Sequence, residues 1–552
     1  MGEQAPVYEV VAETLARLGH RTLFGLLGSG NFKLADHFVR DHGGRCVWTR
    51  HEAAAVSAAH AYAHVTRQLG IATVHQGPGF TNTLTSLTQA VKERQPLLLV
   101  AGETARGQDV NQTIDLDAAA AAVGAAVERV RSGSTVVQDV ARAADRAQRG
   151  RIPVVLPLPI DLQEEPAERG EPEAPWPLNT PRARPAAADV AAVADLVECS
   201  ERPVVLGGRG AVLADARAPL EALADRIGAL LSTSLLGNGL FAGHPASLGV
   251  CGGYSSPLLE RLLPEADLIL AFGASLNQWT TMYGRLFGDT ALVQCDVEPL
   301  AIGRRQPARL GLAGDAAETA EALLLELERR GYESEGYRGG GVADELRAYS
   351  AAAEFTDEAR DGMIDPRTLV ATLDGLLPRE RTVVYDCGHW TWFPTPLLSV
   401  PDPAGFVPAQ GFMSVGHGLA TAVGAAVARP DRPVLALTGD GGAMMALGEL
   451  DSLAGQGLDV LVAIFNDAGY GAEVHHFGPM GRPTGMVEHG ERDFAAVAAA
   501  LGARSAVVRS AGDLAGPVQS WLAAPGGPLV LDCKVDPTLV AERLAEAFAG
   551  GA

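Results

Sequence analysis

The sequence has little cysteine, fewer basic than acidic residues, and no long run that is apolar throughout. Its 552 residues include only six cysteines, without a CxxC pair or regular spacing, which argues against both a zinc site and a disulfide framework. Lysine and arginine total 44 against 66 acidic residues, a net charge of −22 that disfavours binding to nucleic acid or anionic lipid surfaces. The first residues show no signal-peptide pattern, and no continuously apolar run approaches the roughly 18 residues of a membrane span. We expect a cytoplasmic protein that binds neither nucleic acid nor membranes.

The pattern of apolar runs predicts an α/β protein of three parallel-sheet domains. Short runs rich in valine, isoleucine and leucine alternate with alanine-rich helical stretches, which is typical of parallel sheets with helices on both faces. Two polar segments interrupt this alternation. The expected order is a first domain at 1–163, a linker at 164–185, a central domain at 186–330, a linker at 331–343 and a third domain at 344–552. The strongest strand candidates are residues 71–74, 96–100, 153–159, 203–208, 267–273, 291–297, 382–388, 433–441, 460–467 and 528–535.

The strongest local motif lies in the third domain, where an apolar run ends in Gly439, Asp440 and Gly441. Open α/β sheets bind ligands at the carboxyl ends of their strands, and glycines there let the backbone approach a phosphate closely. Because a lone carboxylate would repel a phosphate, Asp440 predicts a divalent cation such as Mg²⁺ between them. Asn466 ends the next apolar run and can offer a second oxygen, and a backbone carbonyl near Ala468 a third. The alternative is a Gly-Asp-Gly that only makes a tight turn and a helix cap.

This turn, followed about two dozen residues later by Asn466 and Asp467, resembles the motif of thiamine diphosphate-dependent enzymes, with Asp467 in place of the usual second asparagine. The resemblance covers nearly the whole chain and implies the thiamine diphosphate-enzyme fold, with pyrimidine-binding, central and diphosphate-binding domains in that order. It also implies the cofactors thiamine diphosphate and Mg²⁺. The cofactor-binding residues that it implies in the third domain are Gly388, His389, Trp390, Met413, Val415, Gly439, Asp440, Gly441, Gly442, Ala443, Asn466, Tyr470 and Gly471. The metal ligands that it implies are Asp440, Asn466 and Ala468, the last through its backbone carbonyl.

Parts of the first domain resemble the pyrimidine side of the same family, acetolactate synthase and benzaldehyde lyase in particular. Glu52, at the start of an alanine-rich helix, looks like the activating glutamate, whose carboxylate pairs with a nitrogen of the pyrimidine ring. The turn at Gly77, Pro78 and Asn82 resembles the glycine-rich turn beside the pyrimidine, and the loop that contains Gly28 resembles an active-site loop. The alternative for Glu52 is an ordinary acidic residue in the first turn of a helix, where the macrodipole favours it.

The resemblance gives individual roles to residues of the third domain. The backbone carbonyl of Met413 is expected to bind the exocyclic amine of the pyrimidine, and the side chain of Val415 to stand between the two cofactor rings. Val415 is smaller than the residue usual at this position. Gly388, His389 and Trp390 resemble the loop on the diphosphate side. His389 and Trp390 have packing as an alternative role, because both residue types are often partly buried for packing alone.

The residues expected around the substrate indicate a mixed pocket. Tyr470 and Glu473 resemble the pattern of simple 2-oxo acid decarboxylases, which makes Glu473 the candidate acid–base group. Gln112 stands where lyases and acetolactate synthases carry a glutamine, and the paired histidines of those decarboxylases are missing. Ala472 and His476 stand where acetolactate synthases have the Met and Trp that shape the second-substrate pocket. The candidate catalytic residues are therefore Glu52, Glu473 and Gln112.

The preferred hypothesis is a decarboxylase or carboligase similar to acetolactate synthase, which transfers an acyl anion equivalent from a 2-oxo acid such as pyruvate to a carbonyl acceptor. The alternatives are a lyase that cleaves the carbon–carbon bond of an acyloin or a dione with the same cofactor, and a non-catalytic cofactor-binding paralogue. FAD is disfavoured as a cofactor, because residues 275–278 lack the arginine and aspartates of FAD-binding relatives. The glycines of the central domain are then only a strand-to-helix turn. Because the two halves of the cofactor contact different subunits in this family, the resemblance implies a dimer or a tetramer.

Overall fold

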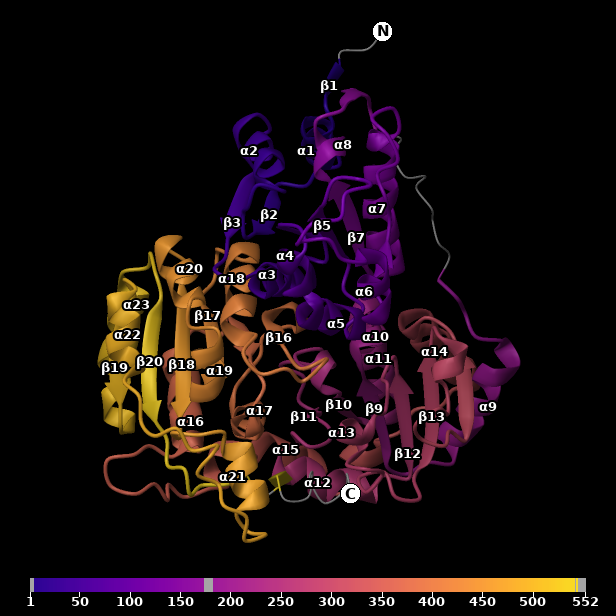
Figure 1. Ribbon diagram of the computed structural model, residues 1–552. Helices are drawn as coiled ribbons and strands as arrows, with labels where there is room; N and C mark the ends of the chain where they lie inside the picture. The colour runs from indigo at the N-terminus through magenta and orange to yellow at the C-terminus, as the bar shows by residue number, and fades with distance from the viewer. Residues whose placement is uncertain (1–3, 173–181, 542, 545–552) are drawn as a thin grey trace.

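Three six-stranded sheets, each flanked by helices, form the molecule. The computed structural model describes residues 4–172, 182–541 and 543–544. The N-terminal domain lies at the top of the view in Figure 1, the central domain at the lower right and the C-terminal domain at the left. All neighbouring strands within the three sheets run parallel. The predicted α/β class with three parallel sheets is therefore confirmed.

The N-terminal sheet is built from short apolar runs whose side chains are nearly all buried. In spatial order its strands are β3 (Arg45–Trp48), β2 (Thr22–Gly25), β4 (Gly70–Val74), β5 (Leu97–Glu103), β7 (Pro153–Pro159) and β6 (Ala126–Val127). Its helices are α1 (Val7–Arg17), α2 (Phe32–Arg40), α3 (Glu52–Thr66), α4 (Pro78–Thr81), α5 (Leu84–Lys92), α6 (Leu116–Ala122), α7 (Val136–Gly150) and α8 (Ile160–Gln163). Burial on both faces explains why its central strands β4, β5 and β7 have continuous rather than alternating apolar patterns.

The central sheet repeats this organisation and has two apolar clusters of its own, one on each face. Its strands, in spatial order, are β11 (Ser247–Val250), β10 (Leu230–Thr233), β9 (Pro203–Gly207), β12 (Leu268–Phe272), β13 (Ala291–Asp296) and β14 (Leu310–Ala313). Its helices are α9 (Ala187–Glu198), α10 (Arg209–Leu213), α11 (Arg217–Ile227), α12 (Pro257–Leu262), α13 (Gln278–Thr281) and α14 (Ala316–Arg330).

The C-terminal sheet carries the Gly-Asp-Gly turn at the carboxyl end of a central strand. Its strands, in spatial order, are β16 (Phe406–Pro408), β15 (Thr382–Tyr385), β17 (Val434–Gly439), β18 (Val460–Asn466), β20 (Leu529–Lys534) and β19 (Arg504–Val508). Its helices are α16 (Pro366–Leu376), α17 (Pro394–Leu397), α18 (Gly418–Ala428), α19 (Asp440–Met445), α20 (Glu449–Gly455), α21 (Gly471–Phe477), α22 (Phe494–Ala500) and α23 (Ala515–Ala523).

Both segments expected to be linkers contain regular structure. Strand β8 (Pro166–Glu168) lies within the first of them and pairs antiparallel with β1 (Gln4–Pro6) near the N-terminus. Residues 173–181 of the same segment lie outside the described residues. The second segment contains a 3₁₀ turn at Gly336–Arg338 and the first residues of α15 (Val342–Ala348). A residue far away in the sequence stabilises this turn, because the backbone N–H of Arg338 donates to the carbonyl of Gly228. The glycines of the segment alone therefore did not indicate the turn.

The N-terminal and C-terminal domains share one hydrophobic cluster, which runs through α3 and α18. Both helices consist mainly of alanine, glycine and valine, so their backbones can approach closely. A Cβ at Gly424 of α18 would collide with the backbone oxygen of Ala58 in α3. The start of α3, which carries Glu52, is therefore fixed against the C-terminal domain.

Among the described residues, none of the helices combines the length and the apolar character that crossing a membrane requires.

Candidate active site

Side-chain oxygens at the carboxyl ends of β17 and β18, including Asp467 Oδ2, are buried without a hydrogen-bond donor among the described residues. Asp440 directly follows β17, and Asn466 is the last residue of the neighbouring β18. Asp440 Oδ1 accepts the N–H of Gly441 at 2.6 Å, whereas Asp440 Oδ2 and Asn466 Oδ1 have no partner among the described residues. Buried oxygens left unpaired cost free energy. A hard cation such as Mg²⁺ would satisfy both, because carboxylate and amide oxygens are its preferred protein ligands.

The expected third oxygen ligand is engaged elsewhere. Ala468 has a positive φ of 66°. Its carbonyl accepts backbone N–H groups from His489 at 3.0 Å and Gly490 at 3.1 Å. This differs from the free carbonyl that the sequence led us to expect, because a later loop, distant in sequence, folds over the site. Coordination by Ala468 would require sharing or displacing these two bonds.

Asp467, which replaces the second asparagine of the motif, makes the site strongly acidic. Burial raises the pKa of Asp440, and burial together with the charge of Asp440 raises the pKa of Asp467. His389 Nε2 lies 3.4 Å from Asp467 Oδ2, but burial and the nearby His475 lower the pKa of His389 to about 3. His389 is therefore neutral at neutral pH and offers no positive charge to the aspartates. A bound divalent cation would supply it.

We expect the stabilisation of the protein by Mg²⁺ to increase with pH. Since the folded state raises the pKa values of Asp440 and Asp467, the folded metal-free protein binds more protons at these two groups than the unfolded chain does. The contribution of these two groups to stability therefore falls as the pH rises above the usual aspartate range of about 4. Metal ligation needs the deprotonated carboxylate and reverses this loss. Thermal unfolding between pH 5.5 and 8, with Mg²⁺ or with NaCl of equal ionic strength, measures the difference, and a Mg²⁺ effect that stays constant or shrinks would contradict the prediction.

The glycines of the site are in contact with aromatic and acidic side chains. A Cβ at Gly441 would come within 2.5 Å of the ring of Tyr470, and one at Gly471 would collide with His389 and Asp467. Ala443 is fully buried and belongs to the hydrophobic cluster that the N-terminal and C-terminal domains share.

The structure gives Trp390 a packing role and an unpaired donor at once. Its indole is buried and stacks on Phe465 with a centroid distance of 4.9 Å. Its Nε1 lies close to Gly388 and Gly439 and has no hydrogen-bond acceptor among the described residues. His389 is buried with its ring 5.3 Å from that of His475. The indole N–H of Trp390 is therefore free to donate to the diphosphate that this loop is expected to contact.

Asp386, which the sequence analysis did not single out, organises the loop expected to bend the cofactor. Its buried carboxylate accepts the backbone N–H groups of Gly416 at 3.0 Å and His417 at 3.1 Å, and the hydroxyl of Thr438 at 2.9 Å. A Cβ at Gly442 would lie 2.6 Å from the same carboxylate and 3.4 Å from Val415 Cγ1. Val415 therefore lies beside the turn that follows Asp440. Asp386 could have been found from the sequence, because it is an acidic residue near the end of the strand predicted at 382–388.

The segment that precedes Val415 is held by the N-terminal domain. Glu93 of that domain accepts the backbone N–H of Gly411 at 3.0 Å, and Gln89 accepts that of Phe412 at 2.6 Å. Met413, next in the chain, has a positive φ of 59° and a half-exposed side chain.

Glu52 lies where the N-terminal and C-terminal domains meet. It is the first residue of α3, and its Oε2 accepts the side-chain amide of Asn82 at 3.0 Å. The preceding Arg50 donates its backbone N–H to Glu449 of α20 at 2.9 Å. Pro78 is the first residue of α4, so it forms the start of the helix that ends just before Asn82.

A second group of residues surrounds the turn at Gly77. Gln112 Oε1 accepts the amide of Gln76 at 3.0 Å, and a Cβ at Gly77 would lie 2.5 Å from the carbonyl of Gln112. His75 accepts the backbone N–H of Gly30 at 3.0 Å, and its ring also lies against Gly28. His75 and Gln76 were missed by sequence reasoning, although their position directly before the Gly-Pro-Gly turn could have indicated them.

The remaining candidate, Glu473, lies half-buried on the short helix α21, which starts at Gly471. The structure thus brings together, around Asp440, the C-terminal candidates Gly388, His389, Trp390, Val415, Tyr470 and Gly471. Separately, it brings together the N-terminal candidates around Gly77. The contacts that join the two domains run through α3 and α5.

The glycines of the central domain have a packing function. Gly210 donates its backbone N–H to Gly273 at 2.8 Å, and a Cβ at Gly208 would collide with the Gly273 carbonyl. The turns after β9 and β12 are therefore in direct backbone contact.

Comparisons with known proteins agree with this arrangement. Three family models match the chain in order: the N-terminal TPP binding domain of thiamine pyrophosphate enzymes at residues 6–121, the central domain at 190–323 and the C-terminal TPP binding domain at 386–533. Thiamine pyrophosphate (TPP) is another name for thiamine diphosphate. The acetolactate synthase large subunit of Parasynechococcus marenigrum is 30% identical over 82% of this chain and 75% of its own length.

Other relatives are a probable acetolactate synthase large subunit of Methanocaldococcus jannaschii and a sulfoacetaldehyde acetyltransferase of Rhodobacter capsulatus. Each is 26% identical, the first over 98% of this chain and 93% of its own length, the second over 84% and 82%. The three domain models match in the order of the family, and the unpaired oxygens of Asp440 and Asn466 lie at the predicted cofactor site. The chain belongs to the thiamine pyrophosphate-dependent enzymes and is similar to the acetolactate synthases.

Proposed function

We propose that the protein is a Mg²⁺-dependent decarboxylase or carboligase that uses thiamine diphosphate to transfer an acyl anion equivalent from a 2-oxo acid such as pyruvate to a carbonyl acceptor. The observation that carries the proposal is the pair of buried, unpaired oxygens of Asp440 and Asn466 beside the turn at Gly441. The names of the acetolactate synthase relatives support the substrate class.

In this proposal Asp440 and Asn466 would hold Mg²⁺, and the turn at Gly441 would receive the diphosphate. The bound cofactor supplies a thiazolium ring as electron sink for the carbon–carbon bond that breaks. Glu52 pairs with the pyrimidine, Val415 keeps the two rings apart, and Glu473 moves a proton at its carboxyl group. Glu52 and Glu473 are half-buried in the single chain, so the exclusion of water from them requires a further cover.

We also propose that a second copy of the chain covers the site. Exposed apolar side chains lie near both groups of candidates, Leu27 and Val110 by the N-terminal group, Met413 and Met445 by the C-terminal group. Two such faces on one chain suit a symmetric dimer or a tetramer, in which the N-terminal face of one copy meets the C-terminal face of the other. We further propose a cytoplasmic location, and a central domain without FAD.

Gln112 stands where lyases as well as acetolactate synthases carry a glutamine, so it also fits a second candidate function, a lyase that cleaves an acyloin or a dione with the same cofactor. The side chain of Gln112 is hydrogen-bonded to those of Gln76 and His75, and its position lacks the histidine pair of the simple 2-oxo acid decarboxylases. A non-catalytic paralogue is less well supported, because Glu52, Asp440 and Asn466 are all present.

The proposal is tested by thermal unfolding of chelator-treated protein, titrated with thiamine diphosphate with and without Mg²⁺. Ligand that binds the native state raises the unfolding temperature. A rise that requires both ligands supports the proposal, and no rise at millimolar concentrations contradicts it. Carbon dioxide release from a panel of 2-oxo acids then separates the two candidate functions. A decarboxylase or carboligase releases carbon dioxide from its 2-oxo acid, whereas a lyase cleaves an acyloin without releasing any.

A further inference from the structure

A buried ion pair lies on the strand next to the proposed metal ligand. Asp532 and Lys534 are two residues apart on β20, so their side chains project from the same face of the sheet. Lys534 is also the register partner of Asn466 on the adjacent strand β18. Lys534 is one of only three lysines in the sequence, yet its side chain is 5% exposed and that of Asp532 is fully buried. Burial of both charges is costly, which suggests a specific role.

Asp532 fixes the orientation of the Asn466 amide. The amide nitrogen of Asn466 donates to Asp532 Oδ1 at 2.8 Å and to the carbonyl of Arg492 at 3.0 Å. Both of its N–H groups are thereby used. A flipped amide would place its oxygen against two acceptors. The oxygen of Asn466 is therefore kept on the opposite side, where it is buried without a donor.

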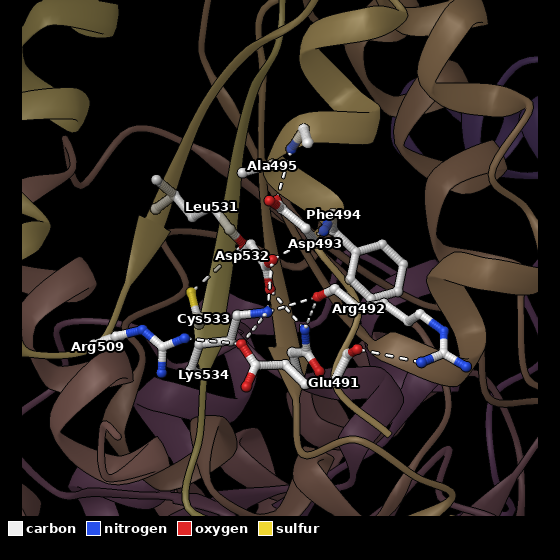
Figure 2. Close-up of polar contacts among 12 residues, drawn as sticks. Glu491, Arg492, Asp493, Phe494, Ala495, Arg509, Leu531, Asp532, Cys533 and Lys534 are labelled. Atoms are coloured by element: carbon white, nitrogen blue, oxygen red, sulfur yellow. Dashed lines mark hydrogen bonds and ion pairs between the residues drawn. The ribbon is translucent and has the colours of Figure 1, made fainter. Parts of the chain in front are cut away.

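Lys534 holds the other acceptor in place. Its ammonium donates to the carbonyl of Arg492 at 2.6 Å, to Asp532 at 2.9 Å and to Glu491 at 3.2 Å. Figure 2 shows the side chains of Lys534 and Asp532 pointing together toward the backbone at Arg492. Phe494 donates its backbone N–H to Asp532 at 2.9 Å.

The segment at residues 489–494, here called the strap, connects two of the three expected metal ligands. Its first residues, His489 and Gly490, donate to the carbonyl of Ala468. Its carbonyl at Arg492 receives the amide of Asn466. The ion pair on β20 anchors the strap through Arg492 and Phe494, so it controls both the Asn466 amide and the loop over Ala468.

We infer that Asp532 and Lys534 are positioning residues, which aim the side-chain oxygen of Asn466 at the divalent cation. The inference rests on the proposed function, because it requires Asn466 to be a metal ligand. Residues that orient a metal ligand typically contribute 10- to 100-fold to metal affinity. Neither Asp532 nor Lys534 contacts the cation in this account.

The test compares Mg²⁺ binding of the full-length double variant D532L/K534M with that of R509Q. The double variant removes both charges, so no unpaired charge remains in the core. Arg509 contacts the same Glu491 at 2.8 Å from the exposed side but does not donate to Arg492, which makes R509Q the matched control. With saturating thiamine diphosphate, the Mg²⁺ concentration that gives half of the thermal shift is the readout. We expect it to rise at least about 10-fold in D532L/K534M and to stay unchanged in R509Q.

A second readout separates positioning from a general structural defect. Excess Mg²⁺ should restore the full thermal shift of the double variant, whereas damage to the fold would persist at any Mg²⁺ concentration. If D532L/K534M does not fold, the same titration of D532N decides, because Asn has the same shape but lacks one acceptor. A folded variant whose half-saturating Mg²⁺ concentration stays within twofold of the unmodified protein overturns the inference. If the proposed function is wrong, the unmodified protein and R509Q also lack the Mg²⁺-dependent shift, and the inference falls with it.

Discussion

Replacing Glu52 with Gln should lower turnover of a 2-oxo acid by about 10²- to 10⁴-fold, the usual contribution of a positioned proton-transfer group. Glutamine has the same shape, and its carbonyl can still accept the amide of Asn82. It has no carboxylate to pair with the pyrimidine nitrogen. Initial rates of carbon dioxide release measure the effect. Thermal unfolding with thiamine diphosphate and Mg²⁺ shows whether the cofactor still binds.

Asn82→Ala is the control for this experiment. It removes a hydrogen bond to Glu52 but keeps the carboxylate, so its loss of turnover should be much smaller than that of Glu52→Gln. Equal losses in both variants would mean that the contact, rather than the charge of Glu52, matters. Unchanged turnover in Glu52→Gln would exclude Glu52 from the mechanism.

Replacing Glu93 with Leu should reduce the free energy of unfolding by about 3–5 kcal/mol, the usual cost of breaking a buried pair. Glu93 Oε2 lies 2.7 Å from His60 Nε2, and both side chains are 2% exposed. The variant also leaves the N–H of Gly411 and the amide of Gln89 without their acceptor. Urea unfolding measures the change. Because the contact to Gly411 crosses between domains, cofactor affinity should fall as well.

Two further variants calibrate this result. Glu93→Gln keeps an acceptor for Gly411 and should cost less than Glu93→Leu. Glu265→Ala breaks an exposed pair with Arg202 and should cost at most about 1 kcal/mol. Burial alone would raise the pKa of Glu93, but His60 and Arg209 outweigh it and lower the pKa. The stabilisation by the Glu93 carboxylate is therefore present at neutral pH and lost as the pH falls into the acid range. A Glu93→Leu variant as stable as the unmodified protein would show that the pair contributes nothing.

Local pattern was enough to predict the sheets and to single out the polar residues at two strand ends. The runs at 434–439 and 460–466 are apolar throughout because both faces of the sheet are covered, and the polar residues that end them stand out. Asp440 and Asn466 were found in this way. The short strand β8 was missed, because its partner β1 lies at the opposite end of the domain in sequence.

Residues that act through backbone groups could not be predicted. Asp386 binds the N–H groups of Gly416 and His417, and Lys534 binds the carbonyl of Arg492. Every residue carries such groups, so the partner leaves no mark in the sequence. The same holds for Ala468, whose carbonyl is taken by a loop about twenty residues further along the chain.

The close packing of α3 on α18 has a consequence for synthesis on the ribosome. Ser57 in α3 bonds to His417, just before α18, across a separation of 360 residues. At roughly 5–20 residues per second, the apolar side of α3 waits tens of seconds for its cover after it has been translated. The central domain, with clusters of its own, is completed within that interval. The nascent chain thus carries an uncovered alanine and valine surface until α18 has been translated.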